Sequence, residues 1–123
     1  AGAFDLEELP KGKGAFAHVM LNQKIDAPGG VKWDGKYLTI GDSTKSVVYR
    51  FAITGTKGTE IGALGLGGAK QVFEYAIEPS RLVVPDYGNG VIAFYRYPAG
   101  GSPLQTYHGP IAPYGAAIST VSR

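Results

Sequence analysis

Apolar residues in this chain occur as short runs separated by glycine-rich and polar segments, a pattern that predicts β-strands. In the clearest run, 46–53, every second residue is apolar: Val47, Tyr49, Phe51 and Ile53. The run 37–40 is apolar or β-branched at nearly every position, as expected for a strand covered on both faces. The expected strands are 3–9, 15–22, 30–33, 37–40, 46–53, 59–64, 71–77, 82–84, 91–97, 103–108 and 114–119.

These strands belong to a repeat with a period of about 44 residues. Residues 34–48 (DGKYLTIGDSTKSVV) align with residues 78–92 (EPSRLVVPDYGNGVI), and residues 27–31 (APGGV) align with residues 112–116 (APYGA) about two periods later. Strand repeats of this length are typical of propeller blades and related arrays. Turn signals separate the strands, among them Asp34-Gly35 and Asn89-Gly90.

The repeat predicts an all-β fold of four-stranded antiparallel β-propeller blades, with about two complete blades and a partial blade at each end. The blades span 28–69 and 70–111. Residues 1–27 correspond to the last two strands of a preceding blade, and residues 112–123 to the first strand of a following one.

Two segments resemble a known family. Residues 82–94 (LVVPDYGNGVIAF) resemble the LYVADYGNNRIQVF run of NHL and SMP-30-like β-propellers, and residues 112–119 resemble the P-x-G-[VI]-A-[VL]-D opening of their blades. Residues 97–103 (YPAGGSP) are similar to a segment of bacterial proteins of this type that have no assigned activity. The resemblance implies a propeller fold and says little about function.

A closed propeller has about four to eight blades, and 123 residues supply fewer than three. We therefore expect either a segment of a larger propeller or a chain completed by other copies, because unpaired strand edges template pairing. The residues expected at these assembly edges are Phe4, Leu6, Tyr114, Ala116 and Ile118.

Composition and charge limit the classes of partner that the chain is expected to bind. With 12 Lys and Arg against 10 Asp and Glu, the net charge is +2 and the basic residues are scattered, so we expect no nucleic-acid partner. No apolar stretch is long enough to span a membrane. The absence of cysteine excludes disulfides and thiolate metal sites and leaves the compartment open; we expect an extracellular or periplasmic location.

Asp42 and Asp86 occupy equivalent positions after the second strand of each blade, and two readings stay open. Each carboxylate could accept hydrogen bonds from its own loop amides as an Asx turn. Alternatively Asp42, Asp86 and Asn89, with Glu74, could bind calcium or zinc, as the resemblance to SMP-30-like lactonases would imply.

Catalytic histidines, a serine nucleophile and a phosphate-binding loop have weaker support in the sequence. His18 and His108 fall at non-equivalent positions on expected outer strands and are interpreted as surface residues. Serines such as Ser43 and Ser80 lie in turns without a nucleophile elbow. The glycine-rich run 62–70 fits neither phosphate-loop nor dinucleotide spacing and is expected to connect two blades. Tyr87 and Tyr107 could be core or contact residues.

We therefore expect a non-catalytic propeller segment that serves binding, assembly or structural support. The alternative is a fragment of an SMP-30-like lactonase or a propeller lyase with a metal site.

Overall fold

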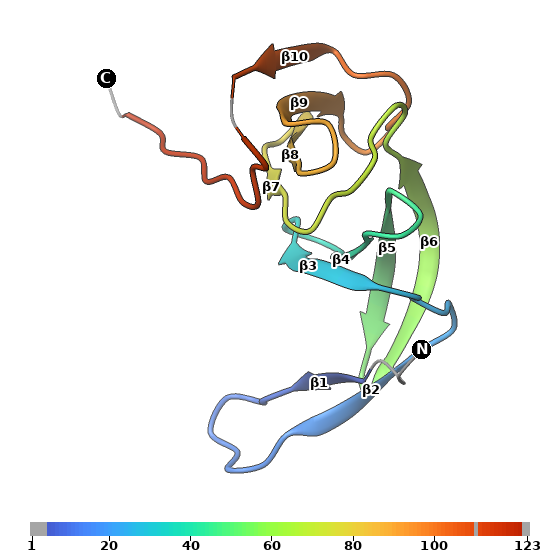
Figure 1. Cartoon of the computed structure of the whole chain (residues 1–123). Coiled ribbons are helices and arrows are strands. Elements are labelled where there is room, and N and C mark those ends of the chain that lie inside the picture. Colours follow the sequence, from blue (N-terminus) through green and yellow to red (C-terminus); the bar gives the residue numbers. More distant parts are fainter. Residues whose placement is uncertain (1–4, 110, 122–123) are drawn as a thin grey trace.

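The strands form close to where the alternating and apolar runs predict them. The structure, a computed structural model, describes residues 5–109 and 111–121, and these residues contain ten strands and no helix (Figure 1). The strands are β1 (Leu6–Glu8), β2 (Ala17–Leu21), β3 (Pro28–Trp33), β4 (Leu38–Asp42), β5 (Val47–Thr54), β6 (Lys57–Gly65), β7 (Ala76–Ile77), β8 (Arg81–Asp86), β9 (Val91–Arg96) and β10 (Gln105–His108).

Two antiparallel meanders repeat the same plan. Strands β3 to β6 pair in chain order, and strands β7 to β10 do the same in a separate four-stranded sheet. The register is also repeated, since Ile40 lies opposite Tyr49 in the first sheet and Val84 lies opposite Ala93 in the second. The 44-residue repeat of the sequence is thus a repeat of strand pairing.

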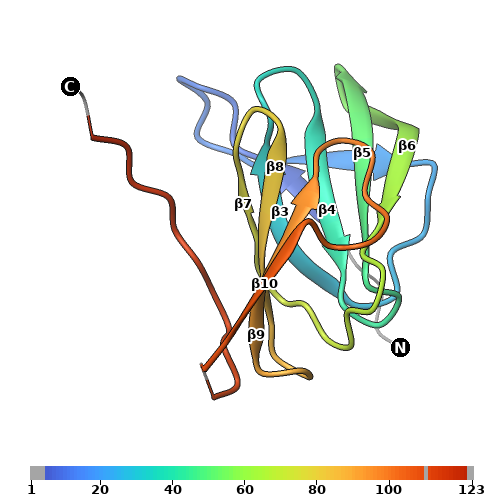
Figure 2. The same cartoon turned by 90° about the horizontal axis from the view of Figure 1, so that it is seen from above.

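The N-terminal hairpin joins the first sheet, which differs from the separate preceding unit that the repeat predicts. Strand β1 is antiparallel to β2, and β2 pairs in parallel with β6 through Met20 and Leu21. The backbone amides of Met20 and Asn22 donate to carbonyls of the β5–β6 hairpin at 2.9 and 3.1 Å. The resulting six-stranded sheet is mixed and curled, with order β1-β2-β6-β5-β4-β3 (Figures 1 and 2).

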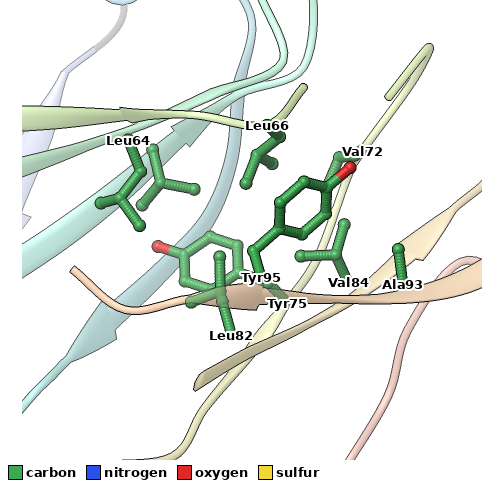
Figure 3. Packing of buried hydrophobic residues seen from close by; sticks show 9 residues of the cluster. Leu64, Leu66, Val72, Tyr75, Leu82, Val84, Ala93 and Tyr95 are labelled. Atoms are coloured by element: carbon green, nitrogen blue, oxygen red, sulfur yellow. The ribbon is translucent and has the colours of Figure 1, made fainter. Parts of the chain in front are cut away.

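One apolar core joins the two sheets (Figure 3). The first sheet and the connection after β6 contribute Val48, Leu64 and Leu66, and the second meander contributes Val72, Tyr75, Leu82, Val84, Ala93 and Tyr95. A second cluster, Ile25, Ile40, Tyr49 and Phe51, lies on the opposite face of the first sheet, where the N-terminal hairpin packs. The first sheet is therefore covered on both faces.

Two expected strands are shortened or missing. The expected strand 71–77 is reduced to Ala76–Ile77, and the carbonyl of Phe73 before it accepts a hydrogen bond from the amide of Gly30 in the first sheet. The expected strand 114–119 is not formed, since no described segment offers these residues a ladder partner. Figure 2 shows this C-terminal segment leading away from both sheets.

No helix among the described residues is long and apolar enough to cross a membrane.

Candidate functional site

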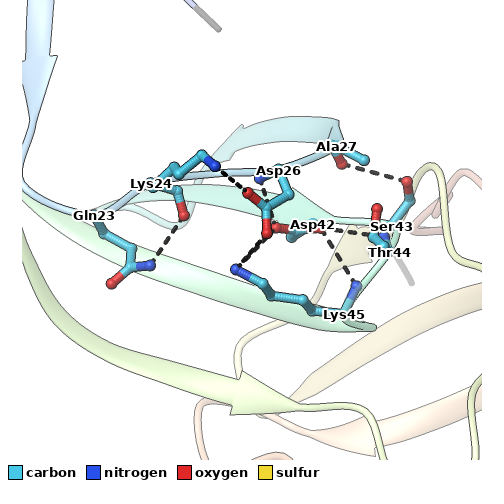
Figure 4. Close-up of polar contacts among 8 residues, drawn as sticks. All are labelled: Gln23, Lys24, Asp26, Ala27, Asp42, Ser43, Thr44 and Lys45. Atoms are coloured by element: carbon cyan, nitrogen blue, oxygen red, sulfur yellow. Dashed lines mark hydrogen bonds and ion pairs between the residues drawn. The ribbon is translucent and has the colours of Figure 1, made fainter. Parts of the chain in front are cut away.

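Asp42 organises the loop after β4 (Figure 4). Its side chain is buried, and its Oδ1 accepts hydrogen bonds from the backbone amides of Thr44 and Lys45 at 3.1 and 3.3 Å. Its Oδ2 accepts from the amide of Asp26 at 2.9 Å, which ties this loop to the segment that precedes β3. The adjacent amide of Ser43 donates to the carbonyl of Ala27 at 2.9 Å.

Asp86 repeats this arrangement in the second meander. Its Oδ1 accepts from the amides of Gly88 and Asn89 at 3.1 and 3.2 Å, and its Oδ2 accepts from the amide of Lys70 at 3.1 Å. The adjacent amide of Tyr87 donates to the carbonyl of Gln71, as Ser43 does to Ala27. Each aspartate therefore accepts from residues two and three positions later and from a residue sixteen positions earlier. We call this arrangement the aspartate clamp.

The second clamp is the more extensive. Asp86 also accepts from the amide of Gln71 at 3.1 Å and from the side-chain amide of Asn89 at 2.6 Å. Asn89 in turn donates to the carbonyl of Gly68. In the first clamp the added partner is the Lys45 ammonium, 3.8 Å from Asp42 and 2.8 Å from Asp26. That ammonium lowers the pKa of Asp26, chiefly through their hydrogen bond.

The clamps show where the predicted metal ligands lie. Asp86 and Asn89 are in contact, Asp42 belongs to the other sheet, and Glu74 pairs with Lys32 at 3.5 Å. Within residues 5–109 and 111–121, no three His, Asp or Glu side chains gather as a metal-binding group. The oxygens of both aspartates are already engaged by amide donors, which is the Asx-turn arrangement.

The other sequence candidates lie at the surface or between the meanders. His18 on β2 and His108 on β10 are both exposed. The glycine-rich run ends β6 and leads into β7, and its Leu66 bridges to Gly101. The amide of Gly67 donates to the carbonyl of Gly101 at 2.8 Å, so the run holds the two meanders together.

A polar cluster that sequence reasoning missed spans the two meanders. Asp34, at the β3–β4 turn, accepts hydrogen bonds from the Tyr97 hydroxyl and from the Arg50 guanidinium. The Nε of Arg50 also donates to the Tyr97 hydroxyl at 3.1 Å, and its guanidinium lies over the rings of Tyr37 and Tyr97. Only the adjacency of the two sheets brings Tyr97 to Asp34.

This cluster perturbs the acidities of its members. Burial on its own would raise the pKa of Asp34, but hydrogen bonds from Tyr97, the loop amides and Arg50 outweigh it and hold the pKa below its ordinary value. Burial, followed by the hydrogen bond to Asp34, raises the pKa of Tyr97 to about 12. Tyr75, deeper between the sheets, donates to the carbonyl of Gly30 and contacts Thr39, and burial raises its pKa strongly.

Equivalent positions of the repeat contact one another in series. Gly29, Phe73 and Tyr114 occupy the same position of three successive units. A Cβ at Gly29 would overlap the carbonyl oxygen of Phe73, and the ring of Phe73 stacks on that of Tyr114 at 4.6 Å. Residues 111–121 thus begin where a third unit would begin, although they form no strand.

The expected assembly edges are only partly described. Phe4 lies outside the described residues. Leu6 packs against the second apolar cluster, and the outer edge of its strand β1 has no ladder partner in the described part of the chain. Tyr114 is exposed and stacked on Phe73, whereas Ala116 and Ile118 are half-buried.

The far face of the second sheet is apolar and faces away from the first sheet. It consists of Val83, Ile92, Phe94 and Tyr107, with Arg81 and Arg96 at one end, as the register of β8, β9 and β10 dictates. Tyr107 is 50% exposed and meets Phe94 edge to face at 5.7 Å, and the Arg81 guanidinium lies 4.8 Å from the Phe94 ring centre.

Comparison with known proteins adds no family: neither the family models nor the curated proteins match this chain.

Proposed function

We propose that the chain is a non-catalytic β-propeller segment that serves binding, assembly or structural support, of the kind that the NHL and SMP-30-like resemblance implies. One observation carries the proposal: two meanders with the same register and the same aspartate clamp pack face to face through one core. Successive blades of a propeller pack in this way, and a repeat unit buries its apolar faces only against its neighbours.

The two meanders are fewer than the four to eight blades of a closed ring. We propose that further blades complete the ring, supplied by other copies or by further chain. The exposed apolar residues of 111–121, among them Ile111, Tyr114 and Val121, support this, because such residues in one segment favour contact with a partner.

Measuring the solution mass tests the proposal directly. We expect light scattering on an eluting peak, across a tenfold range of concentration, to give a species larger than 12.9 kDa. A stably folded monomer at every concentration would contradict self-association of this chain.

The second candidate is a metal-dependent propeller enzyme, favoured by the contact of Asp86 with Asn89 at one loop. It predicts that calcium or zinc raises the thermal midpoint of the wild type relative to EDTA, since a ligand that binds only the folded state stabilises it. Unchanged midpoints with both metals would remove this candidate and leave the clamps as structural devices.

A further inference from the structure

The two meanders place equivalent faces in different surroundings. In the first sheet, the positions one period before Val83, Ile92 and Phe94 are Thr39, Val48 and Arg50. All three face the second meander. Val48 lies in the shared core, Thr39 contacts the hydroxyl of Tyr75, and Arg50 contacts that of Tyr97. The face of the first sheet that carries these residues is therefore an interface already.

The same face of the second sheet, the far face, has no following unit against it within residues 5–109 and 111–121. Val83 is nearly buried by its neighbours, but Ile92 and Phe94 are half-buried and Tyr107 is half exposed. Phe94 occupies the repeat position that Arg50 occupies in the first sheet. This position is therefore charged where the face packs on the other meander and aromatic on the far face. An aromatic pair flanked by arginines is the composition enriched at protein interfaces.

A complementary surface lies on the N-terminal hairpin. Its inner side packs Leu6 and Leu21 on the first sheet, and the register of β1 and β2 turns the other side outward. That outward side carries Asp5 and Glu7 beside His18 and Met20, and Met20 is 65% exposed. We call it the hairpin face. Its charges are Asp5 and Glu7 on the hairpin and Lys57, the register partner of Met20 on β6. On the far face Arg81 is paired with Glu78, so Arg96 carries the net positive charge of that face.

We propose that the far face of one copy docks on the hairpin face of a second copy, with Tyr107 and Phe94 against Met20 and with Arg96 toward Asp5 and Glu7. This inference rests on the proposed function and names its contact surfaces. The occupant is a second copy because the far face is equivalent to the face that the first sheet buries against the second meander, and because Arg96 is opposite in charge to Asp5 and Glu7. Each copy carries one of each face, so the association is head-to-tail and its closure forms a ring.

Mixing two blocked variants tests the geometry. Tyr107→Asp blocks the far face and Met20→Asp blocks the hairpin face, and both side chains are exposed enough for the fold to tolerate the change. Alone, each variant should show a mass of 12.9 kDa at concentrations where the wild type is larger. Mixed in equal amounts, they should form a one-to-one complex of twice that mass, because each retains the face that the other lacks.

A control and a charge exchange sharpen the test. Ile61→Asp alters an exposed apolar residue of β6 that belongs to neither face and should leave the wild-type mass unchanged. Arg96→Glu should weaken association about tenfold, and adding Glu7→Lys should recover most of it. Circular dichroism on every variant, with Tyr107→Ala as a milder second block, separates lost docking from lost folding.

The outcomes separate this inference from the proposed function. If the wild type is oligomeric but either blocked variant keeps its full mass, or the mixture fails to associate, the assembly stands and the head-to-tail contact is wrong. Persistence of the Met20→Asp oligomer with loss of the Tyr107→Asp oligomer would mean that two far faces pair with each other. A monomeric wild type overturns the head-to-tail contact and leaves further chain as the source of the remaining blades in the proposed function.

Discussion

The two meanders share strand order, register and aspartate clamp, yet they differ in what covers their outward faces. The first sheet is enclosed between the N-terminal hairpin and the second meander, whereas the described part of the chain covers only one face of the second sheet. Side chains at equivalent positions follow this difference. Arg50 of the first sheet contacts Asp34 of its own sheet and Tyr97 across the interface, and Phe94 of the second sheet lies under Arg81 at the surface.

The comparison shows that a repeat preserves what a unit needs internally and varies what it presents to its neighbour. Both clamps hold a loop to the segment that precedes the first strand of the same unit, so both are internal. The carboxylates at Asp34 and Glu78 are also equivalent. Asp34 reaches across to Tyr97, while Glu78 pairs with Arg81 of its own turn.

The largest expected effect is at the clamps. We expect Asp86→Ala to lower the free energy of unfolding by about 4 kcal/mol and Asp42→Ala by about 2 to 3 kcal/mol, because each leaves partly buried amides without an acceptor and Asp86 serves more of them. Urea unfolding monitored by tyrosine and tryptophan fluorescence measures both. Equal losses would mean that the added contacts of Asp86 contribute nothing.

The second largest expected effect is a difference in stability loss between variants of Asp34, in the β3–β4 turn, and Glu78, in the β7–β8 turn. Asp34→Asn should cost about 2 kcal/mol, since the side chain is 4% exposed and bound by Tyr97 and Arg50. The matched variant Glu78→Gln should change little, because its pair with Arg81 is exposed to solvent. A large loss in Glu78→Gln would show that the second turn is also structural.

Asp34 also predicts a pH dependence that the same unfolding curves can measure. Its folded-state pKa is lowered, so its contribution is complete at neutral pH and is lost as the pH falls below about 4. The wild type should therefore lose more stability between pH 5 and 3 than Asp34→Asn does. Parallel curves for the two proteins would contradict the lowered pKa.

The smallest expected effect concerns the loops that follow the clamps. Ser46 and Gly90 are equivalent and both have positive φ, 50° and 67°, a conformation that costs a serine more than a glycine. Ser46→Gly relieves this cost in the folded state but gives the unfolded chain more conformational entropy. The expected net effect is a stabilisation of about 0.5 kcal/mol. The reverse change, Gly90→Ser, should destabilise it, and both are measured as shifts of the urea midpoint.

Sequence reasoning found most of the strands because their signals are local. Strand β5 begins one residue from its expected start, and the turn at Asp34-Gly35 lies between β3 and β4 as expected. The equivalence of Asp42 and Asp86 was visible in the repeat, and of the two readings left open, the structure places both side chains in Asx turns. Each aspartate also accepts from a backbone amide sixteen residues before it, that of Asp26 or Lys70. No short-range sequence pattern indicates these two contacts.

Long-range pairing could not be found in this way. Nothing in the residues of β2 indicates a parallel partner in β6, because strand patterns encode which side chains point inward and not which edge they meet. The cluster of Asp34, Arg50 and Tyr97 has the same origin. These residues are 16 to 63 positions apart, and only the packing of the two sheets brings them together.

By itself, the sequence determined that this protein is built from strands in units of about 44 residues, with an aspartate at the same point of each. Alternation and turn residues act over a few positions, and that is enough to specify a unit. The tertiary structure alone decided that the hairpin closes the first sheet. It also decided that, among the described residues, 111–121 find no strand partner and nothing packs on the far face of the second sheet. Those outcomes depend on which surfaces pack together. The hydrophobic effect that drives this packing is non-directional and depends on the apolar area buried, so short-range sequence patterns do not specify it.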